Sequence, residues 1–214
     1  MVLERFEMNL RLEEMKCIAC GKVSEIPRLR ETKICDDCLE QRFVEDEHKE
    51  KVRQYKSYLE ASRIPVRYWN FDITNLEIDE TTFNRMVLTP DSILISGEIG
   101  TGKTNLACQL LIQSRGRFYT INEMYQIHAT RFDWIKQDSL ICIDDISKTA
   151  FAKVSDKIFD LVNYRYNNNK KTIITTDKRL EELEIVLGNE YGSAIVSRIR
   201  EWCVHKIHLK KKWR

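Results

Sequence analysis

Short apolar runs alternate with longer amphipathic segments over most of this chain. The runs that have the pattern of buried strands lie near 92–96, 117–121, 139–143, 172–176 and 203–209. Segments with helical periodicity separate them, near 103–115, 153–168 and 190–200. Strands that alternate with helices predict an α/β domain with a mostly parallel five-stranded sheet, covered on both faces. Ligands of such sheets bind at the carboxyl ends of the strands.

The first 62 residues follow a different pattern. Apolar residues recur at roughly helical spacing over 1–16, and a cysteine-bounded module follows. From 39 to 61 the chain is densely charged and lacks Gly and Pro, which predicts a helix on the order of 30 Å long. Pro65 lies just beyond it, and proline cannot continue a helix interior. The predicted domains are therefore 1–38, a helical linker at 39–62, and an α/β domain at 63–214.

The most specific motif directly follows the first apolar run of the α/β domain. Residues 97–104 have the form G-x-x-x-x-G-K-[ST] of a phosphate-binding loop. Its glycines let backbone N–H groups approach phosphate oxygens, and the next helix points its partly positive N-terminus at the same anion. Lys103 is expected to reach the β- and γ-phosphates, and Thr104 to ligate Mg²⁺. The predicted nucleoside triphosphate site comprises Gly97, Glu98, Ile99, Gly100, Thr101, Gly102, Lys103 and Thr104.

A second part of a nucleotide site follows the 139–143 run. Asp144 at the end of a central strand is expected to hold Mg²⁺, and Asp145 to accept a proton from the attacking water. The alternative is a pair of acids in an ordinary loop. Thr176 and Asp177 end the next strand, where they either sense the γ-phosphate or cap a turn.

Four cysteines form the pattern C-x₂-C-x₁₄-C-x₂-C near the N-terminus. Four thiolates in a tetrahedron select Zn²⁺, and Gly21 permits the turn that folds backbone donors towards the sulfurs. A redox dithiol and unliganded thiols are the alternatives. A closed site of this kind stabilises a core too small to fold alone. The predicted structural zinc ligands are Cys17, Cys20, Cys35 and Cys38.

Composition and charge restrict the class of protein. The chain is 43% hydrophobic and 32% charged, and its net charge of +2 is too small to indicate nucleic-acid binding by itself. Acidic residues slightly outnumber basic ones over 1–62, and the reverse holds over 63–214. This distribution favours a protein partner for the N-terminal part and polyanions for the C-terminal part. We expect no membrane span and no export signal, and a reducing cytoplasm of bacterial type in which Cys108, Cys142 and Cys203 are core thiols.

Several further segments match one family in order and spacing. Residues 64–69 resemble its "IP-x-R-Y" segment, Ile143-Asp144-Asp145 resembles its Walker B "IDD", and residues 163–166 with 172–176 resemble "N-x-R-Y…TIITS". Ser197-Arg198-Ile199 resembles its "SR[IL]" arginine-finger box. With the phosphate loop, this set is similar to the AAA+ ATPases, and within them to the bacterial helicase loaders of the DnaC/DnaI type, some of them phage-borne. The resemblance covers about 64–210.

The resemblance implies a fold and a set of roles. It implies an AAA+ P-loop core without a C-terminal lid, with Thr176 and Asp177 at the sensor-1 turn and Arg198 as a finger acting in trans. Asp177 replaces the family's usual sensor Asn, and an acceptor-only carboxylate there either slows hydrolysis or requires a neighbouring cation. From the residues alone, Arg198 and Arg200 fit surface ion pairs better.

It also implies an activity and partners. Residues 1–60 would grip a replicative DNA helicase hexamer, with the 39–61 helix as a binding arm or only a tether. The ATPase domain would bind ATP and single-stranded DNA, and a homo-oligomer would form on the helicase. Hydrolysis would time helicase loading in replication initiation. Three alternatives are a transposition helper ATPase, a weakly hydrolysing ATP-sensing adaptor, and a small-molecule P-loop kinase, which needs a lid.

Overall fold

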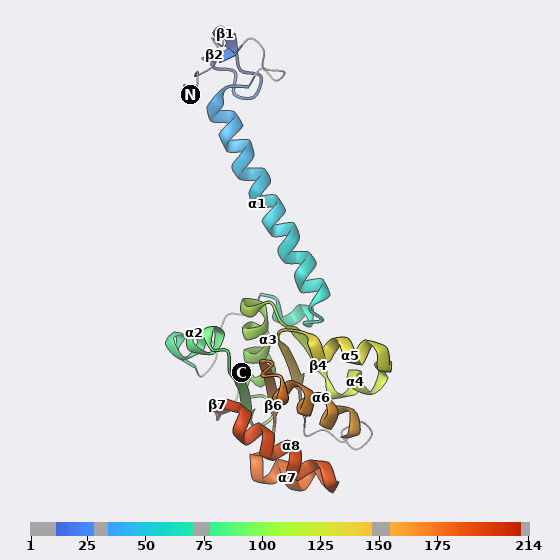
Figure 1. Cartoon of the computed structure of the whole chain (residues 1–214). Helices are drawn as coiled ribbons and strands as arrows, with labels where there is room; N and C mark the ends of the chain where they lie inside the picture. Colours follow the sequence, from blue (N-terminus) through green and yellow to red (C-terminus); the bar gives the residue numbers. More distant parts are fainter. Residues whose placement is uncertain (1–11, 28–33, 71–77, 147–154, 211–214) are drawn as a thin grey trace, which may run out of the picture. The chain divides into compact units, whose positions relative to one another are not determined.

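The computed structural model describes residues 12–27, 34–70, 78–146 and 155–210, and the chain divides into two compact units (Figure 1). The first unit is Met1–Ser57 and the second is Tyr58–Arg214. Residues 1–11, 28–33, 71–77, 147–154 and 211–214 lie outside the described part, together with the predictions that fall on them, such as the start of the 153–168 helix. No helix in the described ranges has the length and apolar character needed to cross a bilayer.

The first unit contains a hairpin and most of a long helix. Strands β1 (Leu12–Lys16) and β2 (Val23–Pro27) pair antiparallel, with Lys16 opposite Val23. The helical spacing over 1–16 is therefore wrong for its described part, which is a strand. The reason is the turn between the strands: Cys17 N–H donates to Lys22 O at 2.8 Å, and Gly21 has a φ of 75°, so the chain folds back.

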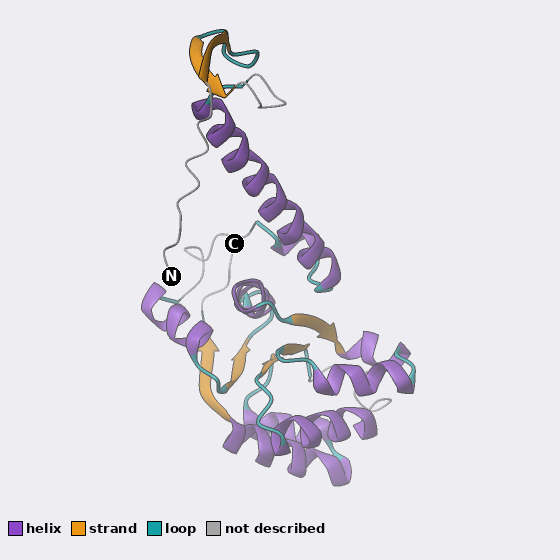
Figure 2. Cartoon of the chain, turned by 45° about the horizontal axis from the view of Figure 1, so that its top comes forward, coloured by secondary structure: helices purple, strands orange, loops and turns teal. Residues whose placement is uncertain are grey.

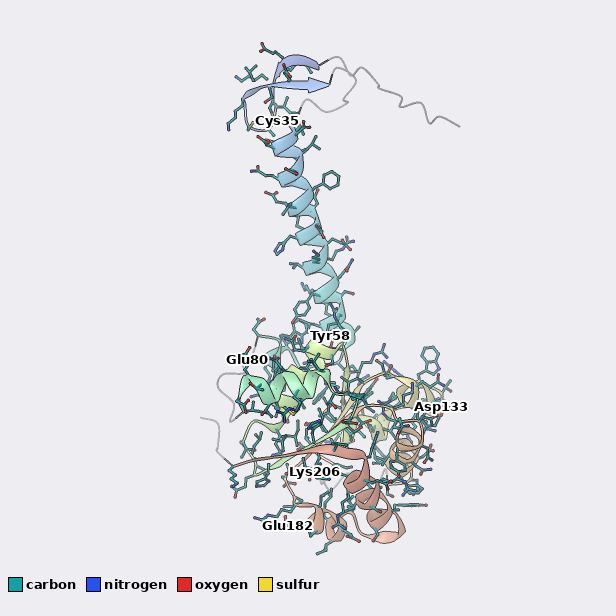
Figure 3. All side chains as sticks on the ribbon, turned by 60° about the vertical axis from the view of Figure 1, so that its left-hand side comes forward. Cys35, Tyr58, Glu80, Asp133, Glu182 and Lys206 are labelled. Atoms are coloured by element: carbon teal, nitrogen blue, oxygen red, sulfur yellow. The ribbon has the colours of Figure 1, made fainter. Side chains whose placement is uncertain are left out.

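Helix α1 (Asp36–Ala61) confirms the predicted helix and begins three residues earlier than expected. Two aspartates in its first turn complement the positive end of the helix dipole. Ion pairs between successive turns, such as Lys51 with Glu47 at 2.8 Å, cover its surface. Its 26 residues correspond to about 39 Å. Figure 3 shows the side chains between Cys35 and Tyr58 projecting outward from the helix.

The last turn of α1 belongs to the second unit. There Leu59 is buried, and the Tyr58 hydroxyl donates to Leu111 O at 2.7 Å and to Gly116 O at 3.1 Å. The helix ends at Ala61, and Arg63 then takes a left-handed φ of 64°. This turn leads into the short 3₁₀ helix η1 (Val66–Tyr68).

In the described part of the second unit, five strands form one parallel sheet in the order β4-β5-β6-β3-β7. The predicted mostly parallel sheet is confirmed. The strands are β3 (Ser92–Gly97), β4 (Arg117–Thr120), β5 (Ile141–Asp144), β6 (Thr172–Thr176) and β7 (Cys203–Leu209). Side chains alternate between two core layers, so Ile93 and Ile95 face one layer and Leu94 the other.

Helices cover both faces of this sheet (Figure 2). One layer contains α2 (Glu80–Leu88) and α3 (Lys103–Ser114). The other contains α4 (Ile121–Gln126), α5 (Ala129–Gln137), α6 (Ser155–Asn167), α7 (Leu180–Leu187) and α8 (Asn189–Trp202). The predicted helices near 103–115, 153–168 and 190–200 correspond to α3, α6 and α8. Helices α2, α4, α5 and α7 were not predicted from the pattern, because each has nine residues or fewer.

A fully buried arginine fixes α6 against β6 and the end of α5. The Arg165 guanidinium donates to Asp138 O at 2.8 Å, to Lys171 O at 2.6 Å and to the Thr172 hydroxyl at 2.8 Å. Burial lowers its pKa to about 10, which still leaves it charged at neutral pH. These bonds hold the start of β6, and β6 carries residues of the candidate site at its other end.

Candidate nucleotide and metal sites

The predicted phosphate loop connects the end of β3 to the start of α3. Its three glycines all have positive φ: 148° at Gly97, 86° at Gly100 and 90° at Gly102. Gly97 is also required by space, because a Cβ there would lie 2.3 Å from Leu209 O on β7. The Lys103 ammonium folds back over the loop and donates to Glu98 O at 2.8 Å. The sequence therefore forms a glycine turn with a cation held across it.

The acidic end of β5 lies directly beside this loop. The Thr104 hydroxyl donates to Asp144 Oδ1 at 3.0 Å, although 40 residues separate them. Asp144 is only 5% exposed and Lys103 only 6%, so both groups lie in surroundings of low dielectric constant. A threonine hydroxyl and a carboxylate at hydrogen-bond distance are suitable ligands for one Mg²⁺. The structure thus brings together the two residues from which the sequence predicted a magnesium site.

Thr175 connects the two acidic residues and was missed by the sequence analysis. Its hydroxyl donates to Asp144 Oδ1 at 2.7 Å and accepts the backbone N–H of Asp145 at 2.9 Å. Asp145 has a left-handed φ of 59°, and the next residue, Ile146, donates its N–H to Thr175 O at 3.1 Å. Thr175 is fully buried in β6, so it holds the Asp144 carboxylate and the backbone of Asp145 in place. The signal in the sequence is a polar residue in an apolar strand, one position before the predicted sensor.

A cavity of about 350 Å³ opens beside the loop. It is lined by Gly100, Gly102, Lys103, Thr104 and Asn105 on one side and by Arg67 and Tyr68 of η1 on the other. The Arg67 guanidinium lies 4.5 Å from the centre of the Tyr68 ring, and Gln109 of α3 fixes η1 by donating to Tyr68 O at 2.7 Å. The size suits a small ligand, and cationic and aromatic groups lie along the wall formed by η1.

Asn105 is a second residue that the sequence analysis missed. It directly follows the loop motif, is 6% exposed, and its buried Oδ1 has no hydrogen-bond partner within the described part of the chain. A buried amide oxygen without a partner carries a desolvation cost of about 1–3 kcal/mol. A ligand that donates to the amide of Asn105 would remove this cost.

The predicted sensor residues directly follow Thr175 in the chain. The predicted arginine finger, in contrast, contacts residues outside the phosphate loop. Thr176 is fully buried at the end of β6, opposite Ser96 of β3, and Asp177 pairs with Lys178 at 3.4 Å. Arg198 on α8 donates to Asn163 Oδ1 at 3.0 Å and to Ala194 O at 2.9 Å. Its contacts are thus with α6 and its own helix, rather than with the loop.

The four predicted metal ligands converge in the first unit. The Sγ atoms of Cys17, Cys20, Cys35 and Cys38 all lie within 4.8 Å of one another, and those of Cys20 and Cys35 are 3.8 Å apart. Two sulfurs on a tetrahedral ion with bonds of about 2.3 Å would be about 3.8 Å apart, so the spacing fits such an ion. The backbone N–H of Cys35 donates to Cys17 Sγ at 3.4 Å. This bond, together with backbone hydrogen bonds from Cys20 and Ala19, lowers the pKa of the Cys17 thiol to about 6.

The remaining cysteines lie in the core of the second unit. Cys108, Cys142 and Cys203 are unpaired thiols that are fully buried. Burial raises the pKa of each, to about 12 for Cys203. Such neutral thiols pack as small apolar groups, as predicted.

No protein-family model and no curated protein matches the sequence. Solved structures do match. A DnaC helicase loader aligns with a TM-score of 0.58 and 24% identity over 68% of this chain and 100% of its own. DnaI aligns with a TM-score of 0.58 and 17% identity over 69% of this chain and 95% of its own. The replication initiator DnaA, solved with AMPPCP and single-stranded DNA, aligns with a TM-score of 0.50 and 19% identity. This alignment covers 71% of this chain and 53% of the DnaA chain. The α/β core therefore has an AAA+ P-loop fold, the fold of these DnaC, DnaI and DnaA structures.

Proposed function

We propose that this chain is an ATP-dependent loader that binds a replicative DNA helicase and helps to place it on single-stranded DNA. The observation that carries the ATPase part is the 3.0 Å contact between Thr104 and Asp144, which unites the glycine loop and the acidic strand end. The similarity of fold to DnaC and DnaI supports the loader part.

In the nucleotide site, the loop amides and Lys103 bind the triphosphate, and Thr104 and Asp144 hold Mg²⁺. Mg²⁺ neutralises charge on the phosphate oxygens when it is bound. Asp145 accepts a proton from the attacking water, and Thr176 and Asp177 lie at the sensor position. AMPPCP in the DnaA structure and the amide of Asn105 support an adenine nucleotide as ligand.

Arg198 is proposed to act on the nucleotide of a neighbouring subunit. Asn163 and Ala194 O hold its guanidinium in one orientation, which lowers the entropy cost of presenting it to a phosphate. This role requires a homo-oligomer, which we propose forms on the helicase.

The first unit is proposed to bind Zn²⁺ and to grip the helicase. The sulfur spacing fits the ion, and the soft thiolate set selects zinc over harder divalent cations. Helix α1 exposes the apolar side chains of Phe43 and Val44, which favours a binding arm over a simple tether.

A weakly hydrolysing ATP-sensing adaptor is the second candidate, and Asp177 is the observation that favours it. An acceptor-only carboxylate at the sensor position repels the γ-phosphate. The ion pair with Lys178 at 3.4 Å supplies the neighbouring cation that offsets this repulsion in part. The loader and the adaptor should both bind ATP, and they should differ in the rate of ATP hydrolysis.

The test is capture of the host's replicative helicase by the tagged full-length chain, with ATP, with ADP and without nucleotide. We expect the wild type to retain helicase in a nucleotide-dependent manner. Lys103→Ala should abolish ATP binding and remove that dependence. A Cys20→Ser/Cys38→Ser double variant should lose capture while its ATP affinity stays unchanged, which shows that the second unit remains folded.

Two results would contradict the proposal in different ways. Capture of helicase by the double cysteine variant at the wild-type level would refute the role of the first unit. Absence of capture in every nucleotide state, with intact ATP binding, would reject the loader function and leave the adaptor or the transposition helper.

A further inference from the structure

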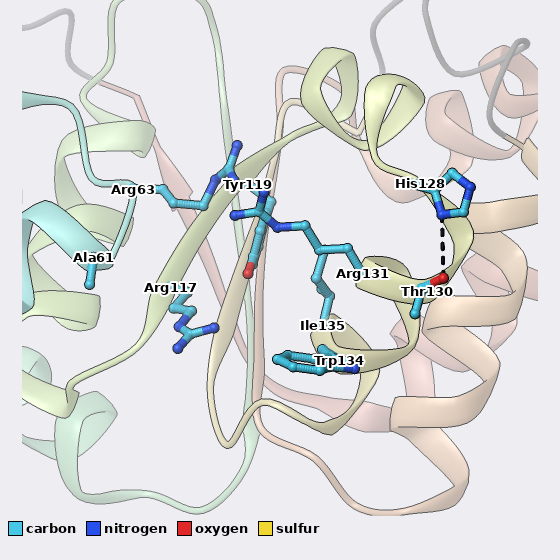
Figure 4. Close-up of a pocket in the computed structure, with 9 residues that line it drawn as sticks. All are labelled: Ala61, Arg63, Arg117, Tyr119, His128, Thr130, Arg131, Trp134 and Ile135. Atoms are coloured by element: carbon cyan, nitrogen blue, oxygen red, sulfur yellow. Dashed lines mark hydrogen bonds between the residues drawn. The ribbon is translucent and has the colours of Figure 1, made fainter.

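A second cavity, of about 510 Å³, lies at the β4 edge of the sheet (Figure 4). Its walls come from the turn after α1, from β4 and from α5, so it shares no lining residue with the cavity at the phosphate loop. Figure 4 shows Arg63 entering from the turn after α1, Arg117 and Tyr119 from β4, and Arg131 and Trp134 from α5. We call it the edge cavity.

The charged side chains that line the edge cavity are all basic. Arg63, Arg117 and Arg131 contribute guanidinium groups, and no described carboxylate lines the cavity. Glu123 pairs with Arg63 at 3.0 Å and Asp138 with Arg117 at 3.3 Å. Arg131 is exposed and has no ion pair in the described ranges. The edge cavity therefore offers several donors and one uncompensated cation, which is complementary to an anion.

Aromatic rings stand among these cations. Trp134 follows Arg131 by three residues, so both project from the same side of α5, and 72% of its surface is exposed. Tyr119 forms part of the wall, and the Arg63 guanidinium lies 5.2 Å from its ring centre. An exposed indole beside a free guanidinium offers a stacking surface and a phosphate partner within one helical turn.

We infer that the edge cavity binds single-stranded nucleic acid, with a base stacked on Trp134 and backbone phosphates paired with Arg131 and Arg117. The volume lies within the range of small-molecule sites and admits one or two nucleotides. An acidic peptide would satisfy the arginines but would leave the indole without a planar partner. The choice of DNA as the nucleic acid rests on the proposed function. The location of the binding site rests on the residues that line the edge cavity.

The strain at one lining residue supports a binding role. Arg63 adopts a left-handed φ of 64°, which is unfavourable for a residue other than glycine, and its buried Nε has no acceptor among the described residues. That conformation aims the side chain at Tyr119 and at the cavity. Strain of this kind is retained where the surrounding structure requires one orientation of a side chain.

The test is fluorescence anisotropy of a labelled 12-nucleotide oligo(dT) with the full-length chain, with and without ATP. Trp134→Ala should weaken binding about 10-fold, because one stacked base contributes about 1–3 kcal/mol. Arg131→Ala should weaken it about 5-fold and reduce the slope of log K against log salt by about 0.7. Tyr125→Ala on α4 and Arg200→Ala on α8 are matched controls, because both residues are exposed and neither lines the cavity. Both control variants should bind as the wild type does.

Two competitors identify the chemistry. An abasic strand of equal length should bind at least 10-fold more weakly than oligo(dT), and polyglutamate should compete poorly. Equal binding of the abasic strand, or tighter binding of polyglutamate that depends on Trp134 and Arg131, would overturn the inference. Wild-type affinity in both α5 variants would overturn it and leave the loader proposal intact. If the wild type binds no oligonucleotide in either nucleotide state, the DNA part of the proposed function fails as well.

Discussion

The Thr175 hydroxyl bonds both acidic residues at the end of β5, Asp144 through its carboxylate and Asp145 through its backbone. It therefore orients the carboxylate that is the proposed metal ligand, and it holds the backbone of the residue proposed as the base. Asp144 thereby accepts hydrogen bonds from two hydroxyls, those of Thr104 and Thr175. Groups that orient a metal ligand affect activity although they touch neither metal nor substrate.

Replacing Thr175 with Val should therefore impair turnover more than binding. The shapes are similar, but the hydroxyl is lost and Asp144 loses one buried donor, at a cost of about 1–3 kcal/mol in stability. We expect ATP hydrolysis to fall about 10–100-fold, while ATP affinity changes only a few-fold. Steady-state hydrolysis and nucleotide titration of the same preparation measure both effects.

Thr175→Ser is the matched control, because it keeps the hydroxyl and should restore most of the turnover. If the valine variant hydrolyses ATP as fast as the wild type, Thr175 has no positioning role. If both variants lose ATP binding together, the defect lies in the fold of β6 rather than in the orientation of Asp144.

At the scale of elements, the predictable parts are those with long or strongly apolar patterns. Strand β3 and helix α3 flank a motif whose glycines specify the turn, and Asp144 directly follows a continuous apolar run, so their proximity follows from a parallel sheet. The short helices have local signals that periodicity does not reveal: α4 begins with a capping box formed by Thr120 and Glu123. The edge cavity could not be predicted, because its walls are three segments that only the tertiary fold brings together.

Residues 163–166 matched the family segment "N-x-R-Y" in sequence, and the structure shows which contacts these residues make. Asn163 orients Arg198, Arg165 binds the carbonyls that join α5, α6 and β6, and the Tyr166 ring packs edge-on against Trp202. Three residues on one helix thus connect the sheet to α8. The spacing of apolar residues does not predict these contacts, because all three residues act through polar or aromatic groups.

Arg165→Met should destabilise the second unit strongly. Methionine fills similar space but leaves the partly buried carbonyls of Asp138 and Lys171 without this donor. The expected loss is about 3–5 kcal/mol in the free energy of unfolding, measured from the urea midpoint. Arg165→Lys keeps the positive charge but loses the forked set of donors. Its urea midpoint should therefore lie between those of the wild type and Arg165→Met. A midpoint within error of the wild type would show that water replaces the guanidinium, which would contradict a structural role.

For the whole molecule, the two units are stabilised by different means. The second unit has two extensive apolar layers around its sheet. Among the described residues of the first unit, the buried core consists of Cys17, Ile34 and Cys35, with Cys38 and Leu39 packed against it. So small a core does not offset the conformational entropy of its own backbone. A metal bound by four thiolates supplies the missing free energy in such modules.

Removal of zinc should therefore unfold the hairpin and leave the second unit intact. We expect one zinc ion per chain by elemental analysis, and its removal by a strong chelator should abolish amide-exchange protection over β1 and β2. Protection of β3 and β6, and the affinity for ATP, should not change. Cys35→Ser should reproduce the chelator's effect, and Cys108→Ala should retain zinc, because Cys108 lies in the other unit. Protection of the hairpin that persists in a metal-free chain would show that the thiol cluster and its apolar contacts suffice, and the structural role of zinc would be wrong.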